Sequence, residues 1–69
     1  MYTAAVITIS DKGYRGERVD TSGPNLCNIL KEKGYDVVYS SILPDDKEMI
    51  QAELCKCADE LGIALVLTT

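Results

Sequence analysis

Apolar residues gather into three short runs along the chain, separated by two segments with helical spacing. The first run, residues 2–9, is rich in β-branched residues, and the last, residues 63–69, is entirely uncharged. The middle run, residues 36–43, ends before Pro44, which restricts Leu43 to an extended conformation. Short apolar runs are typical of strands buried on both faces, as the strands of a parallel sheet are. The pattern therefore predicts three buried strands.

The first segment with helical spacing predicts a helix over residues 22–33. Thr21 or Ser22 can cap its amino end, and Pro24 suits its first turn. Gly34 is the stop signal expected just after the last turn. The predicted buried face repeats at helical intervals, with the stem of a lysine extending it. It comprises Leu26, Ile29, Leu30 and Lys33.

A second helix is predicted over residues 45–61, ending at Gly62. Asp45 and Glu48 have the spacing of a capping box at its start. The apolar positions again fall on one side of the helix. They are Met49, Ile50, Leu54, Cys57, Ala58 and Leu61.

Strands alternating with helices indicate right-handed crossovers in a parallel sheet, so the fold class is α/β with the order β-α-β-α-β. A chain of 69 residues buries only about 60% of its unfolded surface. Three strands and two helices also leave one face or edge of the sheet uncovered. We therefore expect residues 1–69 to be the amino-terminal half of a single domain, completed by further chain or by a partner.

Composition narrows the classes of function. The net charge of −4 argues against a broad nucleic-acid or membrane surface, although it leaves room for a local anion site. No apolar run approaches the length of a membrane span, and no basic leader is present. Three cysteines without histidine suggest reduced thiols, hence an intracellular, cytoplasmic protein. The lack of histidine also excludes a histidine base within these residues.

The segment after the first strand, residues 10–23, is the first candidate for chemistry. It carries Lys12, Arg15 and Arg18, three of the seven basic residues, and leads into a helix amino terminus, which favours phosphate or carboxylate groups. Ser22 and Gly23 would present donors there. The alternative is a solvated, mobile loop in which Ser22 is only a cap, and residue types do not decide between the two. The segment matches neither a P-loop nor a dinucleotide fingerprint.

Acidic and hydroxyl residues follow the strands, where ligands of open α/β sheets gather. Asp11 has a carboxylate suited to Mg²⁺, but an Asx-turn is the commoner role at such a position. Asp45 is either a ligand for Mg²⁺-phosphate or a helix cap, and residue type favours the cap; Asp46 suits either role. Thr68 and Thr69 either bond a ligand or reflect strand propensity, and the second is commoner.

Four stretches together carry a family resemblance: residues 6–11, 20–24, 42–46 and 65–69. In this order and spacing the chain resembles the molybdopterin-binding family, which includes the MoaB/Mog-type molybdenum cofactor biosynthesis proteins and the amino-terminal domain of gephyrin. The resemblance implies a three-layer α/β domain with a mostly parallel sheet. It also implies homotrimers or homohexamers, and contacts with other proteins of molybdenum cofactor biosynthesis.

The activity implied by the resemblance is transfer of AMP from Mg-ATP to molybdopterin; a carrier that binds molybdopterin without turnover is the alternative. Asp45 matches the family's acidic residue with a role in catalysis and Mg²⁺ binding. A Gly-Gly-Thr-Gly loop follows the threonines in the family but lies beyond residue 69, so activity is expected of the parent protein and not of these residues alone. The remaining matched positions near the ligands are Ser10, Asp11, Asp20, Ser22, Gly23, Thr68 and Thr69.

Regulatory α/β domains are the remaining alternative. A receiver domain needs an aspartate after its third strand, where this chain has Thr68 and Thr69. A flavodoxin needs a phosphate loop rich in Ser, Thr and Gly after the first strand, and residues 10–13 match it poorly. Both are therefore less consistent with the sequence than the molybdopterin-binding family.

Overall fold

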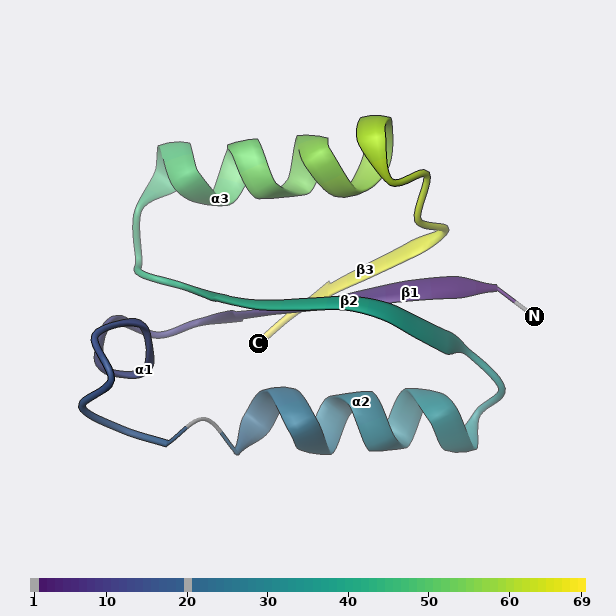
Figure 1. Ribbon diagram of the computed structural model, residues 1–69, viewed down its shortest axis with the longest axis horizontal. Helices are drawn as coiled ribbons and strands as arrows, with labels where there is room; N and C mark the ends of the chain where they lie inside the picture. Colours follow the sequence, from purple (N-terminus) through teal and green to yellow (C-terminus); the bar gives the residue numbers. More distant parts are fainter. Residues whose placement is uncertain (1, 20) are drawn as a thin grey trace.

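The computed structural model describes residues 2–19 and 21–69. Three parallel strands form one sheet in the order β2-β1-β3: β1 (Thr3–Ile9), β2 (Asp36–Leu43) and β3 (Leu65–Thr68). Helix α2 (Ser22–Glu32) covers one face, and α3 (Lys47–Cys55) covers the other (Figure 1). The predicted three-layer β-α-β-α-β arrangement is confirmed.

Strand β1 is the centre of the sheet and of both hydrophobic cores. It is hydrogen-bonded to β2 on one side and to β3 on the other. Side chains alternate between the faces of a strand, so Ala5 and Ile7 pack under α3 whereas Ala4 and Val6 pack under α2. All four are fully buried, which explains why the first apolar run shows no alternation.

Helix α2 matches its predicted bounds to within one residue and is followed by Gly34 at φ 91°, a conformation that glycine adopts without strain. Thr21 occupies the cap position but makes no capping hydrogen bond through its side chain. The predicted buried face was partly wrong. Leu30 is buried and Leu26 packs against the core, but Ile29 is 46% exposed, and Cys27 contacts the core in its place.

The segment from residue 10 to residue 21 was predicted to be a loop, but it contains a one-turn helix, α1 (Asp11–Tyr14). Ser10 caps it, because the Ser10 Oγ accepts a hydrogen bond from the Gly13 N–H at 3.1 Å. A Cβ on Gly13 would lie 3.5 Å from Ile42 Cγ2 and 3.2 Å from Ser10 Oγ. The turn therefore packs closely against the end of β2.

The second helix was predicted from residue 45, but α3 begins at Lys47 and its cap is Asp46. The Asp46 Oδ1 accepts a hydrogen bond from the Met49 N–H at 3.1 Å. The predicted capping box of Asp45 with Glu48 is therefore wrong. One residue of difference at a cap changes which carboxylate is used by the helix.

The predicted α-helix also changes form near its end. Lys56–Glu60 (η1) is a π-helical turn, closed by a 3.0 Å hydrogen bond from the Leu61 N–H to the Lys56 carbonyl. The wider turn disrupts the expected apolar face: Cys57 is fully buried, but Leu61 is 45% exposed. Strand β3 then begins at Leu65, two residues later than predicted, while Ile63 packs into the core.

Candidate functional site

The carboxyl ends of all three strands lie on the same side of the molecule, beside α1 (Figure 1). Backbone hydrogen bonds extend the sheet past the ends of the strands. The Ser10 N–H donates to the Leu43 carbonyl at 2.8 Å, and the Ile9 N–H donates to the Thr69 carbonyl at 2.9 Å. The segment after β1 therefore lies between the segments that follow β2 and β3, as parallel topology predicts.

The turn between β2 and α3 is acidic and is connected directly to the segment after β1. The Asp45 N–H donates to the Asp11 Oδ1 at 2.9 Å, across 34 positions of sequence. The sequence-based prediction that these two segments share one edge is confirmed by this contact. Because Asp46 provides the cap, the Asp45 carboxylate makes no hydrogen bond or ion pair with residues 2–19 or 21–69, and it is exposed.

A cavity of about 300 Å³ opens at the junction of β1, β3 and α2. Its polar lining combines five hydroxyl groups with one guanidinium group, a set of donors suited to phosphate oxygens. Val19 adds an apolar wall, although it is 82% exposed. The lining residues are Thr8, Ile9, Ser10, Gly13, Arg18, Val19, Thr21, Ser22 and Thr69.

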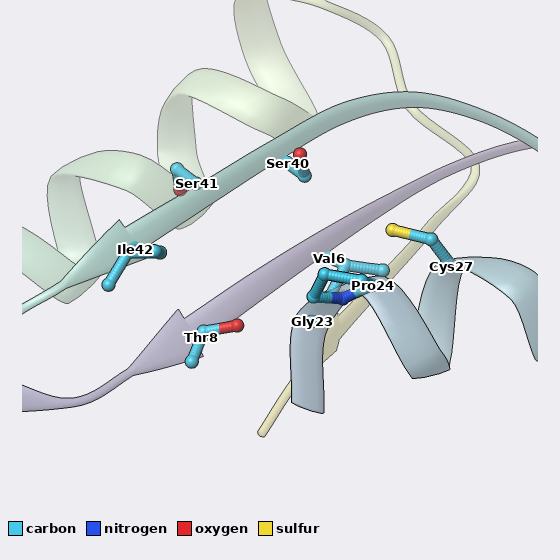
Figure 2. Close-up of a pocket in the computed structure, with 8 residues that line it drawn as sticks. All are labelled: Val6, Thr8, Gly23, Pro24, Cys27, Ser40, Ser41 and Ile42. Atoms are coloured by element: carbon cyan, nitrogen blue, oxygen red, sulfur yellow. The ribbon is translucent and has the colours of Figure 1, made fainter. Parts of the chain in front are cut away.

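A second cavity, of about 400 Å³, lies under α2. Figure 2 shows that its lining includes Gly23 and Pro24, at the start of the helix, together with Val6 of β1. Buried Gly23 has no side chain to fill this space, and Thr8 belongs to the lining of both cavities. Its lining is Val6, Thr8, Gly23, Pro24, Cys27, Ser40, Ser41 and Ile42.

The predicted site residues fall into three groups. Ser10, Ser22 and Thr69 line the smaller cavity, and Gly23 lines the larger one. Asp11 and Asp45 lie together at the acidic turn but line neither cavity. The remaining predictions are Thr68, which pairs with Ile7 and lines neither cavity, and Asp20, which lies outside the described residues.

Sequence reasoning missed several residues of the cavities. Thr8 was assigned only to the first strand and to a stretch that carries the family resemblance, and Ser40 and Ser41 were assigned only to the second strand. The signal that could have identified Thr8 is its position: a hydroxyl close to the carboxyl end of a mostly apolar strand. Thr8 is 5% exposed.

The basic residues of the first loop differ in their availability. Arg15 is paired with Glu17 at 2.7 Å, which neutralises it locally. Arg18 makes no ion pair with any described residue and lines the smaller cavity. The cation available to a bound anion in this cavity is therefore Arg18.

The cysteine thiols are a further group of residues that could take part in chemistry. All three cysteines are free, as predicted. Burial raises the pKa of the Cys57 thiol, and the nearby Glu53 carboxylate raises it further; a neutral thiol is a poor nucleophile.

Within residues 2–19 and 21–69, no cluster of three or more His, Cys, Asp or Glu side chains could hold a metal ion. The same residues form no helix long and apolar enough to cross a bilayer.

Three comparisons with known proteins agree with this architecture. A molybdopterin adenylyltransferase from Pyrococcus furiosus is 45% identical over 64 residues, which are 93% of this chain and 37% of that protein. The molybdenum cofactor synthesis protein cinnamon of Drosophila melanogaster is 40% identical over 68 residues, 97% of this chain and 11% of that protein. The chain thus spans well under half the length of these relatives.

The fold is matched by the crystal structure of the molybdopterin biosynthesis enzyme MoaB from Thermus thermophilus. The TM-score is 0.93 at 37% identity, covering 99% of this chain and 43% of that one. The model of the probable molybdopterin binding domain matches residues 5–69. The chain therefore belongs to the family of probable molybdopterin binding domains.

Proposed function

We propose that the protein acts in molybdenum cofactor biosynthesis, where it binds molybdopterin and transfers AMP to it from Mg-ATP. The observation that carries the proposal is the connected edge of the sheet. Asp11 accepts a hydrogen bond from the Asp45 N–H, and the Asp45 carboxylate itself is left unengaged. Ser10, the neighbour of Asp11, lines a cavity together with other hydroxyls and Arg18. The relative from Pyrococcus furiosus is named for this transfer, which supports the assignment.

Adenylyl transfer is an in-line displacement at a phosphorus atom, with pyrophosphate as the leaving group and negative charge spread over oxygens. Such a reaction depends on positioning and electrostatic stabilisation more than on a protein base. The hydroxyls of Ser10, Ser22 and Thr69 would orient phosphate oxygens in the smaller cavity. Arg18 would offset their charge, and its fixed fork of donors suits two oxygens at once.

The residues present fit Mg²⁺ bound together with substrate. Mg²⁺ is commonly held by one or two carboxylates, with substrate phosphates and water completing its shell. The exposed, unengaged Asp45 carboxylate meets that requirement without a cluster of protein ligands. When bound, Mg²⁺ would supply neutralisation of the charge on the phosphate oxygens. Asp45 would hold it, and the cavity residues would hold the rest of the substrate.

Substitution of Asp45 tests the proposal in the full-length protein. We expect Asp45→Ala to lower AMP transfer by at least about 100-fold, because a charge-stabilising group acts directly on the transition state. Its free energy of unfolding should change by less than about 0.5 kcal/mol, since the side chain is exposed and unpaired. Formation of adenylylated molybdopterin and urea unfolding measure the two effects.

The neighbouring aspartate provides the control. Asp46→Asn keeps an oxygen that can cap α3, so both activity and stability should stay near those of the wild type. Unchanged turnover in Asp45→Ala would remove Asp45 from the chemistry. Molybdopterin binding without any ATP-dependent product in the wild type would instead favour a carrier that binds the pterin.

A further inference from the structure

Asp45 is the central residue of a very tight turn. The Asp46 N–H donates to the Pro44 carbonyl at 2.8 Å, which closes a three-residue turn around Asp45. Asp45 precedes the cap of α3, so its own N–H has no partner within the helix. An outside acceptor is therefore needed to fix the orientation of this peptide group.

Asp11 is that acceptor, through its Oδ1 at 2.9 Å. Asp11 is itself held in place by its surroundings. It is the first residue of α1, whose cap is Ser10 and whose Gly13 packs against the end of β2. The Ser10 N–H is bound to the Leu43 carbonyl, at the last residue of that strand. The acidic turn is thus fixed to the sheet through α1.

We propose that Asp11 is a positioning residue for Asp45, and that it contacts neither the substrate nor the metal. This inference rests on the function proposed above. Its hydrogen bond fixes the backbone from which the Asp45 carboxylate projects, and a displacement of about 1 Å at such a site can reduce a rate about 100-fold. Asp11 lines neither cavity, which separates it from Ser10, its neighbour.

The competing role for Asp11 is that of a second metal ligand, which depends on its charge. A positioning role depends only on an acceptor oxygen at the Oδ1 position. Asn keeps that oxygen and removes the charge, whereas Ala removes both. The pair Asp11→Asn and Asp11→Ala therefore distinguishes the two roles. Asp36→Ala removes an exposed carboxylate at the opposite end of β2 and controls for the change in net charge.

Amide hydrogen exchange at Asp45 is the direct measurement, made on the full-length protein without ligands. Asp11→Ala should speed exchange of this amide about ten- to hundred-fold, as expected for loss of a hydrogen bond to a charged acceptor. Asp11→Asn and Asp36→Ala should keep its protection within about threefold. If the Asp45 amide exchanges at the same rate in Asp11→Ala as in the wild type, the inference is wrong.

Kinetics then separate this inference from the proposed function. Asp11→Ala should lower kcat for AMP transfer about 10- to 100-fold, while the KM for molybdopterin stays within about threefold and Asp11→Asn restores most of the rate. An equally inactive Asp11→Asn with a protected Asp45 amide would identify a metal ligand and overturn the positioning role. Faster exchange in Asp11→Ala with unchanged kcat would show that this hydrogen bond does not position Asp45 for the reaction and would overturn the inference, whereas the loss of activity in Asp45→Ala tests the proposed function separately.

Discussion

The two faces of the sheet are each covered by one helix, yet they are packed differently. Under α3 the core is closed by buried Ile7, Leu43 and Cys57. Under α2 the core includes buried Val6 and Leu30, and Val6 also lines a cavity of about 400 Å³. The face under α3 is thus closely packed, and the face under α2 leaves space near the site.

Small residues explain this difference. At the start of α2 the buried residue is a glycine, Gly23, and the strand positions below it include Thr8 and Ser40. On the other face, the interface is reinforced by a hydrogen bond of 2.9 Å from the Tyr39 hydroxyl to Glu53 and by Lys56 over the Tyr39 ring. The face of β1 under α3 therefore contributes the closely packed core, whereas the face under α2 leaves open space.

The largest expected effect comes from truncating neighbouring residues of β1. Ile7→Ala should lower the free energy of unfolding by about 3–5 kcal/mol, because it leaves a cavity in a closed core. Val6→Ala should cost about 1–2 kcal/mol, since it removes less apolar volume and borders a cavity already. Urea unfolding of both variants measures the difference. Equal losses would show that the two faces are packed alike.

A matched pair of cysteines sharpens the same comparison. Cys57→Ser places a hydroxyl in the closed core and should cost about 1–3 kcal/mol. Cys27→Ser, at the cavity under α2 and only half-buried, should cost less than about 0.5 kcal/mol. Thermal unfolding provides the measurement. A Cys27→Ser variant as unstable as Cys57→Ser would contradict the open character of the α2 face.

The smallest expected effect is a dependence on pH. The pKa of Cys57 lies above its ordinary value of 9.0, so the folded state keeps this proton at a pH where the unfolded chain has lost it. The stability that this provides is complete below pH 9.0 and is lost as pH rises through the folded pKa. As pH rises above 9.0, the unfolding free energy should decline less steeply in Cys57→Ala than in Cys27→Ala. Identical slopes of unfolding free energy against pH would contradict a raised pKa of Cys57.

Much of the fold could be predicted from local pattern. The apolar runs predicted β1 and β2 to within one residue, and Gly34 and Gly62 marked the two helix ends at positive φ. The π-turn of η1 could not be predicted, because it depends on how Cys57 and Ile63 pack under the sheet. Nor does composition alone reveal which of two adjacent aspartates caps a helix.

The candidate site was predictable as a location more than as a set of contacts. Parallel topology brings residues 10–13 and 44–46 to one edge, and the hydrogen bond between Asp11 and Asp45 confirms that they meet. The roles of Thr68 and Thr69 diverged because consecutive residues of a strand face opposite sides. Only Thr69 reaches the smaller cavity.

The order of apolar runs and helical segments by itself determined the layers, the strand directions and the edge where chemistry can occur. These features follow from local periodicity and from the handedness of the crossovers. The tertiary structure decided that Asp46 caps α3, that Asp11 holds the Asp45 amide, and that the space near the site opens under α2. Contacts between residues 34 positions apart depend on packing in three dimensions, which no local pattern records.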